Sequence, residues 1–333
     1  MRTTTHRVAL IGLLSSACYD GLLDVVDAEV DDGADAGAQT SIDPSTGSST
    51  GAVDDTGGGD GDLDGAGTGS SGAGGDEGTT GAPPTGATPE NLRVAFFGDN
   101  GLGGESVETL QLVIAEDADM LVVLGDFDYD NDPTAWHEQI DEALGADFPL
   151  FAAAGNHDVS AWDGYREVLM ERLAPIVDAD CDGPIGEQMH CRVQGIDLFL
   201  SSVGTMDPPG DQSHEDWLAE GLAASPQIWR FCAWHKNQND MQAGGKGNEV
   251  GWEAYRNCMN GGAIIATGHE HSYARTQTLT DLGNPESGHG AKGEHHVMTV
   301  GTGSTFVFVS GLGGNEVRDY EEDLHDDDTW WST

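Results

Sequence analysis

The 333-residue sequence predicts an α/β sandwich with mixed sheets, preceded by a long tether. Three observations lead to this prediction. The folded part begins with a strand-helix-strand-helix-strand pattern, it ends in a region rich in short apolar runs, and the residues before position 91 lack the composition of a folded domain. Polar side chains follow several of the apolar runs, so the strand ends are where we expect a functional site.

The first elements of the sandwich are predicted from the apolar pattern between residues 91 and 173. Apolar runs that lead into Gly-Asp or Gly-Asn are predicted as buried strands, at 91–100, 118–127 and 148–158. The helical spacing of apolar residues predicts three helices, at 105–117, 133–144 and 162–173. Later strands are predicted at 195–203, 229–235, 262–271, 295–303 and 304–314.

The segment 19–90 is predicted to be a disordered, acidic Gly/Ser/Asp-rich tether. It holds no Lys or Arg, 16 Asp or Glu and almost no aromatic residues, so it cannot bury enough apolar surface to offset its chain entropy. The folded domain is therefore expected over 91–333. That domain carries about −32 of the net charge of −46, because it holds 43 of the 59 acidic residues and 11 of the 13 basic ones. A surface of this sign repels phosphate backbones, so we expect no nucleic-acid partner.

The first 18 residues are predicted to be an export signal. Arg2 and Arg7 precede the apolar run 8–14, and small residues follow. Cys18 resembles the lipidated cysteine of a bacterial lipoprotein, which predicts an outer-membrane or cell-surface protein whose only membrane contact is a lipid anchor at Cys18. Secretion after ordinary signal cleavage is the alternative, because Leu14 stands four residues before the cysteine instead of three.

The remaining four cysteines agree with export, because an even number is typical of disulfides in an oxidising compartment. Three pairings are possible. Closeness along the chain favours Cys181 with Cys191 and Cys232 with Cys258. None of the zinc-binding CxxC spacings is present.

Six polar residues of metal-ligand type stand at or just past the ends of predicted strands. In open α/β sheets, ligands bind at the edge where the carboxyl ends of the strands meet. One such residue would mean little, but six predict a metal site. They are Asp99, Asp126, Asn156, His235, His269 and His271.

The blocks that contain these residues resemble those of the calcineurin-like metallophosphoesterases. GDNG (98–101), GDFDY (125–129), GNHD (155–158), FCAWH (231–235) and GHEHSY (268–273) occur in the family's order, within a resemblance that spans about 93–315. This resemblance implies a β-sandwich of two mixed sheets flanked by helices, in four αββα layers.

Within that superfamily the chain resembles the purple acid phosphatases. Gly101 stands where most metallophosphoesterases have a histidine ligand, and Tyr129 stands where purple phosphatases supply a tyrosinate. A phenolate is a hard anionic donor that favours trivalent iron. The resemblance therefore implies two metal ions, Fe(III) and a divalent Zn, Mn or Fe.

The resemblance also implies a role for each residue of the site. Asp99, Tyr129 and His271 would bind Fe(III), and Asn156, His235 and His269 would bind the divalent ion. Asp126 would bridge the two ions. The implied reaction is hydrolysis of phosphomonoesters by attack of a metal-bound hydroxide on phosphorus.

Catalysis and substrate binding are expected from residues beside the ligands. His157 resembles the family's histidine that protonates the leaving group or steadies the phosphate, and Asp158 could orient it. The substrate is expected to contact Asn156, His157, Lys236, Asn237 and Lys246. Plant-type purple phosphatases carry further histidines after the residue that corresponds to His235, but no histidine occurs within 236–255 here. The family resemblance therefore implies least about the residues that recognise the substrate.

Other interpretations remain open at this point. A phosphodiesterase or nucleotidase could use the same scaffold, and a surface lipoprotein could hold metals or phosphate without turnover. Tyr129 could be a core tyrosine, His157 a structural hydrogen-bonding residue, and Lys246 a solvated loop residue. The sequence makes no prediction of the oligomeric state.

Overall fold

The computed structural model describes residues 8–12, 24–27 and 91–332, with side chains described from residue 91 onward apart from Glu322. The described residues fall in one compact unit. The predicted lipid anchor at Cys18 and all of the predicted tether except 24–27 lie outside them. No helix in this part of the chain is long and apolar enough to cross a membrane.

The first sheet contains five strands in the order β2-β1-β3-β4-β5. β3 (Leu92–Phe97), β4 (Met120–Val123) and β5 (Leu150–Ala152) are parallel, as the strand-helix-strand pattern predicts. β1 (Val8–Gly12) runs parallel to β3, and β2 (Asp24–Asp27) pairs antiparallel with β1. β1 comes from the apolar run of the predicted export signal.

The second sheet contains seven strands in the order β11-β12-β10-β9-β8-β7-β6. Its central strands β8 (Ile196–Ser201), β9 (Trp229–Trp234), β10 (Ile264–Thr267) and β12 (Val307–Ser310) are parallel. Antiparallel strands flank them, namely β6 (Ala179–Asp182), β7 (Gln188–Val193) and β11 (Tyr273–Arg275). This sheet is therefore mixed.

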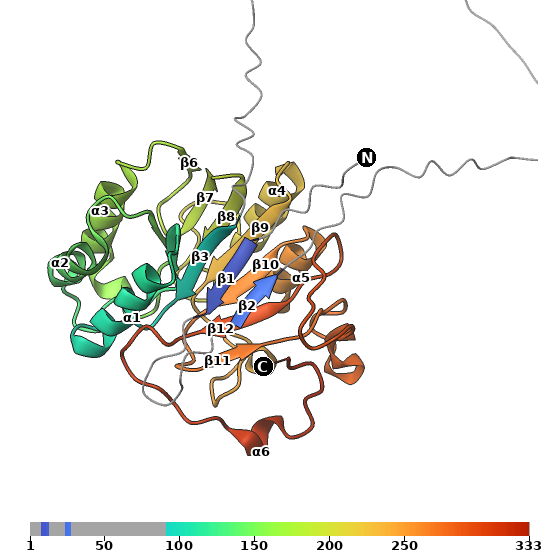
Figure 1. Ribbon diagram of the computed structural model, residues 1–333. Helices are drawn as coiled ribbons and strands as arrows, with labels where there is room; N and C mark the ends of the chain where they lie inside the picture. Colours follow the sequence, from blue (N-terminus) through green and yellow to red (C-terminus); the bar gives the residue numbers. More distant parts are fainter. Residues whose placement is uncertain (1–7, 13–23, 28–90, 333) are drawn as a thin grey trace, which may run out of the picture. The chain divides into compact units, whose positions relative to one another are not determined.

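The two sheets pack face to face, and helices cover the outer face of each (Figure 1). Along β3, Leu92, Val94 and Phe96 point into the core between the sheets. There the ring centroids of Phe96 and of Phe231 from β9 lie 5.4 Å apart. The alternate residues Ala95 and Phe97 belong to the outer core. The three helices on that side are α1 (Gly104–Ala115), α2 (Pro133–Leu144) and α3 (Trp162–Leu173).

The opposite face of the seven-stranded sheet packs against α4 (His214–Ala224) and α5 (Trp252–Asn260), and a short helix α6 (Glu322–His325) follows near the C-terminus. The four αββα layers confirm the predicted fold class. A continuous apolar core on both sides of each sheet fixes the positions of the strand ends, because a close-packed interior tolerates little displacement.

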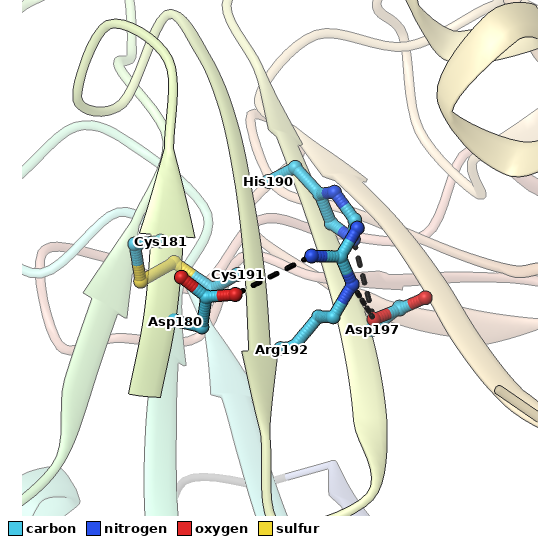
Figure 2. The surroundings of a disulfide bond; sticks show 6 residues. All are labelled: Asp180, Cys181, His190, Cys191, Arg192 and Asp197. Atoms are coloured by element: carbon cyan, nitrogen blue, oxygen red, sulfur yellow. Dashed lines mark hydrogen bonds and ion pairs between the residues drawn. A yellow bond between two sulfur atoms is a disulfide. The ribbon is translucent and has the colours of Figure 1, made fainter. Parts of the chain in front are cut away.

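The two favoured disulfide pairings are both present. Cys181 and Cys191 stand directly opposite each other on β6 and β7 (Figure 2). Cys232 of β9 is joined to Cys258 of α5, which ties the second sheet to its covering helix.

The strand predicted at 295–303 does not form. Gly301 and Ser304 make a tight turn instead, in which Ser304 N–H donates to the Gly301 carbonyl at 2.8 Å. The preceding Val297 points outward with 53% of its surface exposed, whereas Met298 is buried. The apolar composition suggested a strand here, but the glycines of the segment allow the chain to turn. The turn prevents the segment from pairing with a neighbouring strand over several residues.

Candidate metal centre

The predicted ligands come together because their strands end at a common edge. Asp99 follows β3, Asp126 follows β4 and Asn156 follows β5, and these are neighbours in the first sheet. His235 follows β9 and His269 follows β10, which are neighbours in the second sheet. The site therefore lies where the carboxyl ends of strands from both sheets meet.

The backbone around these residues is held in an uncommon conformation. Asp99, Asp126, Tyr129 and His269 have φ values of 62°, 54°, 61° and 70°, and they are four of the nine non-glycine residues with positive φ in the described part of the chain. Such residues cost on the order of 1–3 kcal/mol each and cluster at functional sites. Hydrogen bonds stabilise two of them here, because Asp99 N–H donates to the Gly125 carbonyl at 3.0 Å and His269 N–H donates to Asp99 Oδ2 at 2.8 Å.

Gly155 shows how closely the loops approach each other. A Cβ at this position would lie 2.1 Å from Asp126 N and 2.3 Å from Asp126 Oδ1. Only glycine fits there, which gives a physical reason for the glycine of the GNHD block.

Asp99, Tyr129 and His271 form the first group of donor atoms. Tyr129 Oη lies 2.9 Å from Asp99 Oδ1 and 3.0 Å from His271 Nε2, and His271 Nε2 lies 3.2 Å from Asp99 Oδ1. An ion bound at about 2.0–2.2 Å separates its ligand atoms by roughly 3 Å. The three atoms therefore have the spacing of ligands around one ion.

Asp126, His235 and His269 form the second group. His235 Nε2 lies 3.1 Å from Asp126 Oδ2 and 3.0 Å from His269 Nδ1, and these ligand atoms all lie within 4.8 Å of one another. All three residues are buried. They can hold a metal ion.

Asn156 adds an observation of its own. Its Oδ1 atom is buried and has no hydrogen-bond partner in the described part of the chain. Leaving a buried carbonyl oxygen unpaired costs about 1–3 kcal/mol, so a cation at this position would satisfy it.

The outer nitrogen of each histidine ring faces an acceptor. His235 Nδ1 lies 2.8 Å from the Leu124 carbonyl, which can only accept, so this nitrogen donates and Nε2 is the nitrogen that faces the site. His269 Nε2 lies 2.7 Å from Glu249 Oε2, and His271 Nδ1 lies 3.4 Å from Glu316 Oε1. These contacts turn His235 Nε2 and His269 Nδ1 toward one place, an arrangement that a cation, whether a metal ion or a proton, stabilises.

In the absence of a metal ion, a proton supplies the positive charge of the second group. Burial disfavours a charge on His235, but the Asp126 carboxylate outweighs burial and raises the pKa of His235 to about 9. Burial and the charge of His235 lower the pKa of His269 to about 4. Burial alone would raise the pKa of Asp126, yet the charge and hydrogen bond of His235 hold it well below its ordinary value. One imidazole of the pair is thus charged and the other neutral.

Tyr129 is held as a neutral phenol when no metal is present. Burial and the charges of Asp99 and Asp126 raise the pKa of Tyr129 far above its ordinary value. Asp126 therefore acts on the first group through Tyr129 and on the second group through His235, which places its carboxylate beside both groups.

His157 lies at the edge of the site with its side chain exposed. Its ring packs against the ring of Tyr129 with centroids 4.6 Å apart, and its backbone N–H donates to Asp126 Oδ1 at 2.8 Å. The imidazole is accessible to a ligand of the site.

Asp158 makes contacts that the sequence did not suggest. Its buried carboxylate accepts three backbone N–H groups, with Oδ2 bonded to Gly155 N at 2.7 Å and Asp126 N at 2.9 Å, and Oδ1 bonded to Phe127 N at 2.8 Å. No hydrogen bond joins it to the His157 ring in the described part of the chain. These contacts of Asp158 thus hold the loop of Asp126, and an orienting role toward His157 stays a prediction.

Three of the five residues expected to contact the substrate lie in different surroundings. Lys236 Nζ pairs with Glu249 Oε1 at 3.1 Å. Asn237 is buried, and its Nδ2 donates to the Gly268 carbonyl at 2.5 Å, which supports the turn before His269. Lys246 is partly exposed and makes no ion pair with a described residue, while its charge acts on His269 and Glu270.

Sequence reasoning missed Glu249 and Glu316. Glu249 lies in the loop between β9 and α5, and Glu316 follows the glycine-rich turn after β12. Neither residue stands in a recognisable block, and acidic residues are abundant in this chain, so no sequence signal singled them out.

A β-sandwich that carries two groups of metal-type ligands at its strand ends is typical of metal-binding α/β proteins. The profile of the calcineurin-like phosphoesterases matches residues 92–273, which is more than half of the sequence. The chain therefore belongs to the calcineurin-like phosphoesterase family.

Other comparisons add little to this assignment. No curated protein matches the sequence significantly. One matching solved structure, described as "Structure of PhoD", is 13% identical with a TM-score of 0.39, and the alignment covers 67% of this chain and 56% of that one. The chain thus spans just over half of the length of that protein.

Proposed function

We propose that this chain is a phosphatase that hydrolyses phosphomonoesters with a dinuclear centre like that of the purple acid phosphatases. Asp99, Tyr129 and His271 would hold Fe(III), and Asn156, His235 and His269 would hold a divalent Zn, Mn or Fe ion. Asp126 would bridge the two ions. The observation that carries this proposal is the contact of Tyr129 Oη with both Asp99 Oδ1 and His271 Nε2.

The surroundings of Tyr129 favour a trivalent ion at the first group. Because burial and two carboxylates raise its pKa so far, the phenol loses its proton only to a strongly charged cation in the same place. Three oxygen and nitrogen donors that include a phenolate suit Fe(III) better than a softer divalent ion. A divalent ion beside neutral Asn156 and two neutral imidazoles suits the second group.

The local charge of the site explains how an anionic substrate could bind to so acidic a protein. A trivalent and a divalent ion bring more positive charge than Asp99, Asp126 and the tyrosinate remove. A net positive charge therefore remains at the strand ends although the domain as a whole carries about −32.

When bound, the two ions would lower the pKa of a water molecule and offset the charge of the phosphoryl oxygens. The protein's own residues would do the rest. His157, exposed beside Tyr129, would donate a proton to the leaving oxygen, because an accessible imidazole beside the site can act as a general acid. Lys246 would contact the phosphate, since it is partly exposed and its ammonium group makes no ion pair with a described residue.

Export is part of the same proposal. Two disulfides are typical of proteins outside the reducing cytosol, and the sequence before Cys18 has the pattern of an export signal. Lipidation of Cys18 would then attach the enzyme to a bacterial outer membrane or cell surface.

The decisive experiment combines a visible spectrum, metal analysis and turnover. The purified protein should absorb visible light through tyrosinate-to-iron charge transfer, and Tyr129→Phe should remove this band. The protein should also hydrolyse p-nitrophenyl phosphate faster than bis(p-nitrophenyl) phosphate. His157→Ala should lower kcat about 10²–10⁴-fold while sparing metal content.

Three results would redirect the proposal. A colourless protein that holds two metals per chain would replace Fe(III) by a second divalent ion. Faster hydrolysis of the bis ester would indicate a phosphodiesterase or nucleotidase. Metal binding without turnover of either ester would indicate a metal- or phosphate-binding protein.

A further inference from the structure

Glu249 contacts the second group of ligands from a loop that no block of the family resemblance covers. Its Oε2 lies 2.7 Å from His269 Nε2, and its Oε1 lies 3.1 Å from Lys236 Nζ. The loop holds the backbone of the residue as well, because Glu249 N–H donates to the Asn237 carbonyl at 3.0 Å. Two contacts thus hold the carboxylate and a third holds the backbone, with 30% of the side chain exposed.

The contact with Glu249 determines which nitrogen of His269 can bind a metal. An ionised carboxylate only accepts hydrogen bonds, so His269 Nε2 must carry the proton. The lone pair is then on Nδ1, which lies 3.0 Å from His235 Nε2 on the side of Asp126. Without an acceptor at Nε2, the ring could carry its proton on Nδ1 or turn away, and either change removes a ligand.

We propose that Glu249 is a positioning residue that sets the affinity of the divalent site by fixing the tautomer and orientation of His269, and that Lys236 holds Glu249 in place. The proposal rests on the proposed function, in which Asp126, His235 and His269 bind a metal ion. It also reassigns Lys236, which the sequence placed on the substrate, to the support of a ligand. Outer-sphere partners of this kind are worth 10–100-fold in metal affinity.

Glu316 offers a matched control on the other histidine of the HxH pair. It faces His271 Nδ1 at 3.4 Å, a longer contact than the 2.7 Å of Glu249. Glu316 is also more exposed, at 55%, and Arg318 Nε already donates to the same Oε1 atom at 2.9 Å. A carboxylate that is exposed and shared in this way should contribute little to ligand orientation.

The test measures Zn²⁺ binding to the metal-free full-length protein by competition with a chromophoric chelator. Glu249→Ala should weaken the affinity about 10–100-fold. Glu249→Gln should recover much of this loss, because its amide oxygen still accepts from Nε2. Glu316→Ala should stay close to the wild-type affinity.

A second readout reports the tautomer directly. Long-range ¹H–¹⁵N NMR spectra of the histidine rings should show His269 protonated at Nε2 in the metal-free wild type. The same ring should show mixed protonation in Glu249→Ala. A role in folding alone would not change the tautomer of a folded variant.

The outcomes separate this inference from the proposed function. If the wild type binds no Zn²⁺, the metal centre itself is refuted. If the wild type binds Zn²⁺ and Glu249→Ala binds it equally well, the metal centre stands and the role of Glu249 is refuted. Equal losses in Glu249→Ala and Glu316→Ala would also refute positioning, because they would show a general effect of negative charge. If Glu249→Ala does not fold, the Gln variant and its ring tautomer decide the question.

Discussion

Replacing Asp158 by asparagine separates two uses of this carboxylate. If Asp158 orients the His157 ring, as the sequence suggested, Asp158→Asn should leave stability unchanged and lower kcat. If it holds the loop of Asp126, as its three backbone contacts indicate, the same substitution should lower stability and metal content together. Asn is the sharpest probe because it keeps the shape and removes only charge and one acceptor.

The magnitude follows from the three hydrogen bonds. Asn can keep its oxygen at the position that accepts from Gly155 N and Asp126 N, but its amide nitrogen then faces Phe127 N–H and leaves that donor unpaired. An unpaired buried donor costs about 1–3 kcal/mol. Burial and the charge of Asp126 raise the pKa of Asp158 to about 7, so above about pH 8 the carboxylate is ionised and the loss of its charge weakens the two remaining bonds by roughly 1 kcal/mol each. We expect Asp158→Asn to lower the free energy of unfolding by about 3–5 kcal/mol.

Urea denaturation of the metal-free protein measures this loss, because bound metal would add stability that masks it. Asp163→Asn is the control, since the Asp163 side chain is 93% exposed on α3 and should change stability by no more than about 0.5 kcal/mol. Native stability and full metal content in Asp158→Asn, with activity lost, would refute the loop-holding role and restore the catalytic one.

Two further predictions concern the metal centre. Gly155→Ala should abolish metal binding, because its Cβ would stand 2.1 Å from Asp126 N, and elemental analysis showing two metals per chain in this variant would contradict the packing argument. Zn²⁺ affinity should rise about tenfold per pH unit between roughly pH 6 and 8, because His235, with a pKa raised to about 9, must lose its proton before it can bind the ion. Chelator competition at several pH values checks this slope, and an affinity independent of pH would show that no proton is displaced.

The parallel strands could be predicted from sequence because they are buried on both faces. β4 is apolar without interruption and β3 is interrupted only by Arg93, so their runs stand out from the surrounding loops. β7 was missed for the opposite reason. It places the buried polar residues Gln188 and His190 in the sheet. The His190 ring stacks on the Phe199 ring with centroids 4.2 Å apart, and no local sequence pattern predicts this pairing.

The candidate ligands could be found for a related reason. Each follows a recognisable strand, and parallel neighbours carry their ends to the same edge, so local patterns were enough to bring the residues together. Glu249 and Glu316 reach the site only because two irregular loops fold back onto it. Arg318 N–H donates to the His271 carbonyl at 2.9 Å, for example, which brings the segment after β12 against the HxH turn. Such contacts depend on the whole fold, so the spacing of residues along the sequence does not predict them.

Lys236 shows the limit of inferring roles from residue type beside a ligand. A lysine next to His235 suggested a phosphate contact, but the domain holds 43 acidic residues against 11 basic ones, so an acidic partner lies within reach of most cations. The ammonium group of Lys236 meets Glu249 Oε1 at 3.1 Å, and the other oxygen of that carboxylate meets His269. In a chain this acidic, a lysine that binds phosphate must be kept away from carboxylates, and Lys246 fulfils that condition better than Lys236. Replacing Lys246 should therefore raise KM for a phosphomonoester, whereas replacing Lys236 should act first on metal affinity.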